Sequence, residues 1–281
     1  MYHLTLNGID FAYGKEKLTL NNITLDIKNP QLISIIGPNG VGKSTLIHCM
    51  NRVLSPVKGT VIIDDLDIST IKIKDLARKV GYVPQAANDT FPLTVVDTIL
   101  MGRNPHNKWR GDHKKDMEIV KKVLEMMDIV PLAMRPFNEL SAGQHQRVML
   151  ARGLAQEPDI LLLDEPTANL DIRHQMDVTR LLKKLSLQKD IVIIMISHDL
   201  NLAAKYSDNV IMMSNGGIFA VGKPEDVITK ENIKAVYNVD SELIEHGGRP
   251  HMILLDPNYS EADLKTRDGS YVLGEINIEG A

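Results

Sequence analysis

The chain has 281 residues, enough for one large core or two small ones, and its composition of 43% hydrophobic and 24% charged residues is that of an ordinary globular protein. A net charge of −4 excludes the strongly basic surface of proteins that bind nucleic acid in bulk. Cys49 is the single cysteine, so an internal disulfide is excluded. The longest apolar runs fall far short of the roughly 20 residues of a membrane-spanning helix, and the first residues alternate like a strand. We therefore expect a cytoplasmic protein.

The first part of the chain is predicted to be rich in strands. Alternating or β-branched patterns indicate strands at Tyr2–Phe11, Leu20–Ile27 and Thr60–Asp64, each bounded by turn residues. The apolar run Leu32–Ile36 indicates a buried strand, and a glycine-rich loop connects it to a predicted helix at Ser44–Asn51.

Helical patterns dominate residues 93–155, where Lys115–Met127 places its methionines and aliphatic residues on one face, as in a core helix. Two buried strands follow, Ile160–Leu163 and Ile191–Ile196, separated by a helical stretch through Met176–Leu187. Strands that alternate with helices predict a parallel sheet.

A hairpin is expected at Asn209–Val221, turning at Asn215-Gly216-Gly217, and short helices are expected at Glu225–Ile228 and Glu231–Tyr237. The tail from Pro257 is polar and partly acidic, which is typical of an appendage. No internal repeat is visible in the sequence.

The stretch GPNGVGKST fits the phosphate-binding pattern G-x-x-x-x-G-K-[ST] and lies between a predicted strand and a predicted helix, as that motif requires. Backbone N–H groups of the loop and of the helix start would surround phosphates. Lys43 would reach the β- and γ-phosphates, and Ser44 would bind Mg²⁺. The residues predicted to contact the nucleotide are Gly37, Pro38, Asn39, Gly40, Val41, Gly42, Lys43, Ser44 and Thr45.

Polar residues at two strand ends supply candidate catalytic groups. ILLLDEP is an apolar strand that ends in Asp164 and Glu165, whose side chains are expected on opposite sides because side chains alternate along a strand. Asp164 would hold the Mg²⁺, and Glu165 would act as general base on the attacking water. His198 ends the other buried strand, at the sheet edge where ligands bind. Gln85 precedes the helical region and could reach both metal and water.

The stretch LSAGQ reads as the start of a helix with Ser141 as N-cap and Gly143 in the first turn. Such a helix start suits an anion, yet the neighbouring sequence supplies neither an anion nor a residue to act on one.

These motifs, in this order, resemble the ATP-binding cassette ATPases from about Tyr2 to Val239. The resemblance implies that Tyr13 stacks on adenine, that Asp171 in TANLD lies along a dimer interface, and that two subunits enclose two ATP molecules. Ser141, Gly143 and Gln144 would then contact the ATP bound by the second copy. Two departures are mild: Ala142 replaces a common glycine, and His145 replaces a Gln or Arg and is expected to be a neutral surface variant.

The resemblance also implies the architecture, an α/β P-loop NTPase fold with a parallel core sheet, an N-terminal antiparallel β subdomain and an inserted helical subdomain. The cassette would span 1–240, with the helical subdomain at about 88–157 and a C-terminal extension at 241–281.

The segment Thr90–Trp109 and the ending His246–Pro257 are similar to ATPases of importers for iron–siderophore, haem and cobalamin complexes. In such importers this segment contacts integral-membrane channel subunits, which act with a separate substrate-binding protein. The chain would then be a peripheral protein on the cytoplasmic face of the cell membrane, with no nucleic-acid partner. Arg103 and His106 are expected to be exposed there.

A soluble single-cassette ATPase of the iron–sulfur assembly type stays open as the alternative. A degenerate, non-enzymatic cassette is disfavoured because Lys43, Asp164, Glu165 and His198 are all present.

Overall fold

The computed structural model describes residues 3–14, 17–85, 93–106 and 113–255. The strands of its largest sheet are β3 (Gln31–Ile36), β6 (Val80–Val83), β7 (Ile160–Leu163), β8 (Val192–Ile196), β9 (Asn209–Ser214) and β10 (Gly217–Gly222). They lie in the order β10-β9-β3-β8-β7-β6. The four pairings from β9 to β6 are parallel, and only β10 pairs antiparallel within this sheet. The carboxyl ends of β3, β7 and β8 therefore meet at one edge, which is where the conserved geometry of open α/β sheets places ligands.

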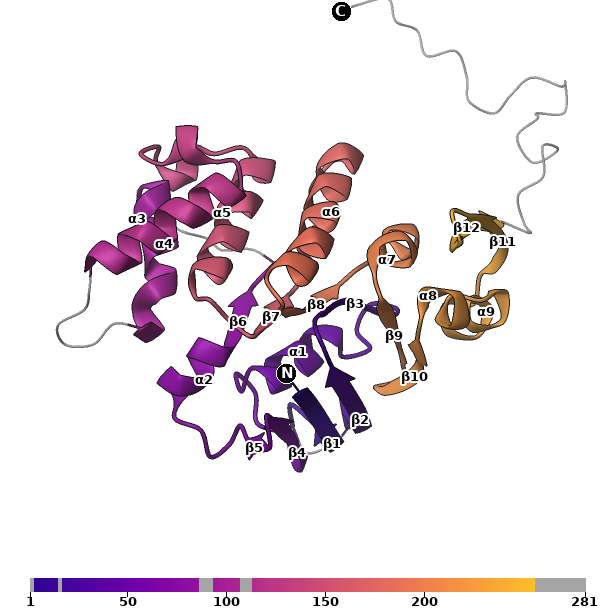
Figure 1. Ribbon diagram of the computed structural model, residues 1–281. Helices are drawn as coiled ribbons and strands as arrows, with labels where there is room; N and C mark the ends of the chain where they lie inside the picture. Colours follow the sequence, from indigo (N-terminus) through magenta and orange to yellow (C-terminus); the bar gives the residue numbers. More distant parts are fainter. Residues whose placement is uncertain (1–2, 15–16, 86–92, 107–112, 256–281) are drawn as a thin grey trace, which may run out of the picture.

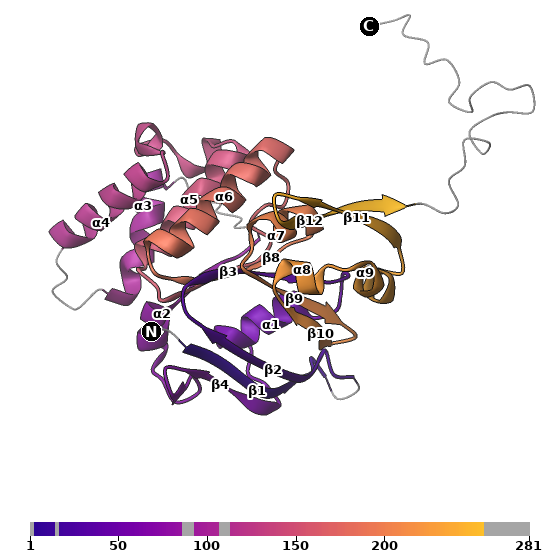
Figure 2. The same ribbon diagram turned by 45° about the vertical axis from the view of Figure 1, so that its right-hand side comes forward.

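The N-terminal part forms a second, antiparallel sheet in the order β2-β1-β4-β5. Its strands are β1 (His3–Phe11), β2 (Leu20–Lys28), β4 (Lys58–Ile63) and β5 (Leu66–Asp67). Helix α1 (Lys43–Met50) lies between the two sheets (Figures 1 and 2). Apolar side chains of β1, β2, β3 and α1 share one buried cluster, so the core joins both sheets around the loop that precedes α1.

The helical region follows α2 (Ile73–Lys79) and β6 and forms a separate lobe beside the main sheet (Figure 1). It contains α3 (Val95–Leu100), η1 (Met101–His106), α4 (His113–Met126), η2 (Val130–Leu132), η3 (Phe137–Glu139) and α5 (Ala142–Ala155). Its apolar faces pack with those of α6 (Ile172–Gln188) in a second buried cluster.

The C-terminal elements cover the other end of the sheet (Figure 2). They are α7 (Leu200–Tyr206), α8 (Pro224–Val227), α9 (Lys230–Tyr237) and a separate hairpin of β11 (Asp240–His246) and β12 (Arg249–Leu255). The side chain of Asn201 in α7 pairs with both backbone groups of Met252, at 2.7 and 3.1 Å, and so fixes the hairpin to the helix.

The predicted α/β class and parallel sheet are confirmed, and the predicted strands and hairpin occur within about two residues of their expected positions. Helix α2, strand β6 and the hairpin β11–β12 were not predicted. Residues 90–92, 107–109 and the tail from Pro257 lie outside the described residues. In the part of the chain that the structure describes, no helix is long and apolar enough to cross a membrane.

One expectation about the surface is wrong. Arg103 is only 2% exposed, and His106 is half-buried with its Nε2 at 2.8 Å from the carbonyl oxygen of Gln156. Arg103 donates to Asp116, to the carbonyl oxygen of Ala155 and to Glu157, at 2.9, 2.6 and 2.8 Å. The arginine therefore joins η1 to α4 and to the end of α5, which pattern reading missed because its partners lie far away in sequence.

Replacing Arg103 with alanine should destabilise the protein by about 3 kcal/mol, because it leaves the mostly buried carboxylate of Asp116 without its cation. Urea denaturation followed by helical circular dichroism would measure this loss. Arg135→Ala, which removes an exposed arginine 3.9 Å from Glu139, should change stability by no more than about 0.5 kcal/mol. Equal effects of the two substitutions would contradict the assignment.

Candidate functional site

The phosphate-binding loop connects the end of β3 to the start of α1 and has two backbone positions that require glycine. Gly42, the N-cap of α1, has φ 101°, and a Cβ there would lie 2.9 Å from the carbonyl oxygen of Thr19. A Cβ on Gly37, with φ 147°, would lie 2.5 Å from the carbonyl oxygen of Met213. Because Gly42 has no side chain to cap α1, the first N–H groups of the helix face the loop, ready for an anion.

Lys43 is the cation of this loop and is 6% exposed. Its Nζ donates to the carbonyl oxygens of Gly37 and Pro38, at 2.8 and 2.9 Å. Burial lowers the pKa of Lys43, and the charges of Glu165 and Asp164 oppose that shift. Carbonyl oxygens of the loop thus hold the ammonium group of Lys43. Phosphate oxygens of a bound nucleotide could replace these carbonyl oxygens.

Ser44 and Asp164 bring two oxygens together beside the loop. The Ser44 hydroxyl donates to Oδ1 of Asp164 at 3.1 Å, and Asp164 is 8% exposed. Burial raises the pKa of Asp164, while the hydrogen bond from Ser44 opposes the rise. A buried carboxylate with one hydroxyl donor is poised to accept a cation.

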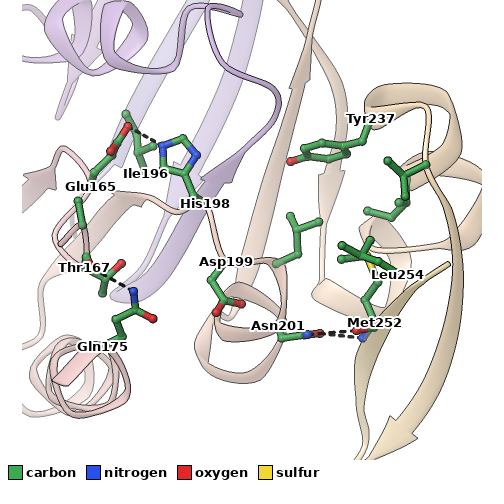
Figure 3. Close-up of a pocket in the computed structure, with 14 residues that line it drawn as sticks. Glu165, Thr167, Gln175, Ile196, His198, Asp199, Asn201, Tyr237, Met252 and Leu254 are labelled. Atoms are coloured by element: carbon green, nitrogen blue, oxygen red, sulfur yellow. Dashed lines mark hydrogen bonds and ion pairs between the residues drawn. The ribbon is translucent and has the colours of Figure 1, made fainter. Parts of the chain in front are cut away.

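Glu165 faces away from Asp164 and lies between Gln85 and His198. Its Oε2 accepts from Nε2 of Gln85 and its Oε1 lies beside Nε2 of His198, both at 2.6 Å. Figure 3 shows the pair of Glu165 and His198 at the edge of an open cavity of about 740 Å³. The two carboxylates diverge as predicted, but for a different reason: β7 ends at Leu163, and Glu165 has a left-handed backbone with φ 49°.

His48, Tyr82 and Tyr237 also lie near the site, which was not predicted. Nε2 of His48 in α1 lies 2.9 Å from the Tyr82 hydroxyl, and burial, with the charge of Asp164, raises the pKa of Tyr82 to about 12. Burial also raises the pKa of Tyr237 to about 12, although the backbone N–H of Gly37 opposes this rise. Both tyrosines look like ordinary apolar-face residues in the sequence, so only the fold connects them with the site.

Tyr13 stands at the outer rim of the loop with 69% of its surface exposed. Its ring packs edge-on against Phe11 at 4.9 Å, and its hydroxyl lies 3.2 Å from Oγ1 of Thr45. One face of an aromatic ring is thus held in place next to the phosphate loop, as stacking on a base would require.

The LSAGQ stretch forms the start of α5, with Ser141 as N-cap. A capping box joins Ser141 and Gln144: Oε1 of Gln144 accepts from the Ser141 N–H at 3.1 Å, and Ser141 Oγ accepts from the Gln144 N–H at 3.5 Å. Asp171 caps α6 in the same way through the N–H of His174, at 2.9 Å. Among the described residues, Ser141 contacts Gln144, and Gly143 contacts His174. The phosphate loop of the same chain is not among these neighbours.

The expectation that His145 is a neutral surface variant is wrong. Its ring lies on that of the buried Phe137, with ring centroids 4.0 Å apart and the planes tilted by 34°. His145 therefore packs the first turn of α5 onto η3.

Comparison with known proteins agrees with this geometry. A family model described as ABC transporter matches residues 20–168. An uncharacterized ABC transporter ATP-binding protein of Methanocaldococcus jannaschii is 47% identical over 89% of this chain and 97% of its own length. The petrobactin import ATP-binding protein FpuC of Bacillus anthracis is 36% identical over 88% and 91%. The ferric enterobactin transport ATP-binding protein FepC of Escherichia coli is 38% identical over 85% and 89%.

Two solved structures extend the comparison. A metal-chelate type ABC transporter in an inward-facing conformation superposes with a TM-score of 0.79 at 25% identity, over 92% of this chain and 99% of the other. An ATP-binding cassette in a dimeric post-hydrolysis state bound to ADP and Pi superposes with a TM-score of 0.68 at 30% identity, over 79% and 98%. The chain belongs to the ABC transporter family and is an ATP-binding ATPase of that family.

Proposed function

We propose that this chain is the ATP-hydrolysing subunit of an importer of a metal chelate, working as a homodimer with Mg²⁺. The proposal of ATP hydrolysis rests on the position of Glu165. This residue follows Asp164, which pairs with Ser44 at the phosphate loop, and its carboxylate contacts Gln85 and His198. A carboxylate so held beside the loop is suited to take a proton from a water that attacks the γ-phosphate.

The residues beside the loop fit Mg²⁺. Ser44, Asp164 and the amide oxygen of Gln85 are hard oxygen donors, which Mg²⁺ prefers. Within the described ranges, no group of three or more His, Cys, Asp or Glu side chains could hold a metal alone. Mg²⁺ is commonly bound by one or two carboxylates together with substrate phosphates, so one buried aspartate with a neighbouring hydroxyl is the expected protein share. The metal would neutralise phosphate charge during transfer.

Side chains and backbone groups of the protein would bind the nucleotide and orient the general base. Lys43 and the N–H groups at the start of α1 would hold the negative charge of the β- and γ-phosphates. His198 and Gln85 would orient the Glu165 carboxylate toward the water through their bonds to its two oxygens. Tyr13 would stack on the adenine and so place the nucleotide in the loop.

Two copies are needed because the start of α5 supplies an anion site that the described residues of its own chain do not fill. The Ser141 hydroxyl accepts a bond in the capping box, which leaves its hydrogen to be donated. The γ-phosphate of an ATP bound by a second copy is an anion that this helix start could bind. Asp171 would lie near the same contact between the two copies. The dimeric relative bound to ADP and Pi supports this arrangement.

Import of a metal chelate is supported by the relatives, among which FpuC carries the name petrobactin import and FepC the name ferric enterobactin transport. These relatives give no support to the iron–sulfur assembly alternative. An importer requires integral-membrane channel subunits and a separate substrate-binding protein, and would hold this chain as a peripheral subunit on the cytoplasmic face of the membrane. Because Arg103 is buried, the exposed residues Met101 and Asn104 of η1 are the better candidates for the contact with a channel subunit.

Glu165→Gln should lower ATP hydrolysis by at least about 100-fold while ATP still binds, because the amide cannot take the proton from water. The unhydrolysed ATP should then hold two copies together. Size-exclusion chromatography with ATP and Mg²⁺ would detect that dimer, and Glu118→Gln on the exposed face of α4 serves as the matched control. A variant that stays monomeric, or that turns over at the normal rate, would refute the assignment of Glu165.

Mixed dimers test whether the site is shared. Ser141→Arg should block closure over the ATP of the partner without affecting the loop of its own chain, whereas Lys43→Ala should weaken phosphate binding in its own chain. A dimer with one change in each subunit contains one site in which both changes meet and one unchanged site. Counting the ATP retained per dimer should give a single occupied site, and equal retention at two sites would contradict the model.

Met101→Ser together with Asn104→Asp should leave the isolated ATPase unchanged but lower uptake per ATP in reconstituted vesicles by at least about fivefold, which requires the two contact residues together to contribute about 1 kcal/mol. Leu187→Ser, at an exposed apolar position of α6, provides the control. Loss of the isolated ATPase, or normal coupled uptake, would exclude η1 as the docking segment.

A further inference from the structure

The ring of His174, in the first turn of α6, lies on the backbone of Gly143, in the first turn of α5. A Cβ placed on Gly143 would lie 2.9 Å from Cδ2 and 3.3 Å from Nε2 of this ring. Gly143 is an ordinary helical residue and is absent from the positions with positive φ. A side chain at position 143 would therefore require the ring of His174 to move.

The carboxylate of Asp171 holds the ring in this position. Nδ1 of His174 donates to Oδ2 of Asp171 at 2.8 Å, while the backbone N–H of the same histidine donates to Oδ1 at 2.9 Å. These bonds lower the pKa of Asp171, the backbone bond most of all. The backbone bond alone already caps α6, so capping does not explain why the ring is bonded as well.

We propose that His174 is a positioning residue that fixes the start of α5 to the start of α6. This inference rests on the proposed function, in which Ser141 and Gly143 on one helix and Asp171 on the other meet the second copy together. Further along, Val148 of α5 and Val178 and Leu182 of α6 belong to the same buried cluster. The ring of His174 connects the two helices at their exposed starts, where the side chains of His174 and Asp171 are 47% and 65% exposed. The two helix starts then approach the ATP of the partner as one rigid surface.

The test uses a dimer in which only one ATP site remains, and it places His174→Ala in one or the other of the two subunits. Both subunits carry Glu165→Gln, and one also carries Lys43→Ala, so ATP is retained only on the intact loop, beneath the α5 of the Lys43→Ala subunit. His174→Ala in the Lys43→Ala subunit should speed ATP release by roughly five- to tenfold, because the start of α5 loses the contact between Gly143 and the ring; that ratio corresponds to about 1 kcal/mol. The same substitution in the other subunit should leave release unchanged. Both dimers contain identical residues, so a general loss of stability would affect them equally.

Equal release from the two arrangements, or release as slow as with both histidines intact, would overturn the positioning role. Failure of the dimer with both histidines intact to retain ATP would instead refute the shared site on which the inference rests.

His174→Asn separates the two contacts of the ring. Its amide can still donate to Asp171, but the side chain is too short to cover Gly143. The thermal midpoint of this variant should match that of the unchanged protein, while ATP release should be as fast as in His174→Ala. Normal release from His174→Asn would show that the contact with Gly143 has no role.

Discussion

Two adjacent carboxylates serve one site, and the left-handed backbone at Glu165 gives them different partners. If Glu165 continued β7, strand alternation would place its side chain on the opposite face of the sheet from that of Asp164. With φ 49°, the chain turns at once: Asp164 is buried against Ser44, and Glu165 faces Gln85 and His198. Lys43 lies close enough to feel both charges. The cost of a left-handed non-glycine residue is offset by the bonds to both oxygens of its carboxylate.

The residues of the phosphate loop could be found from sequence because their chemistry is local. Glycines, a lysine and a hydroxyl at fixed spacing after a buried strand define the loop, and the structure places them between β3 and α1 as expected. Asp164, Glu165, Gln85 and His198 come together because parallel strands end at one edge of the sheet. The alternation of strands and helices predicts the parallel sheet, but it predicts neither the strand order nor β6, the strand that leads to Gln85.

What pattern reading missed depends on contacts between residues remote in sequence. Arg103 is expected at the surface because its segment is predicted to dock a membrane subunit, but the structure pairs it with Asp116 and the carbonyl oxygen of Ala155 and leaves it buried. His174 reads as one more polar residue on the exposed side of α6. Only its distance to Gly143, 31 positions earlier, shows that its ring contacts the start of α5. No periodicity or composition signal carries such information.

Helix α5 connects these separate findings. At its C-terminal end, Gln156 donates to the carbonyl oxygen of Val80 at the start of β6, the strand that leads to Gln85, and Arg103 and His106 bind the carbonyl oxygens of Ala155 and Gln156. At its N-terminal end, the backbone of Gly143 lies under the ring of His174. Fourteen residues at about 1.5 Å each make this a rigid element of about 21 Å. A displacement of η1 would therefore move α5 as a unit, because the backbone bonds along the interior of the helix keep its shape. It must shift either β6, and with it Gln85, or the helix start that faces the partner, and either shift changes the site at which ATP is hydrolysed.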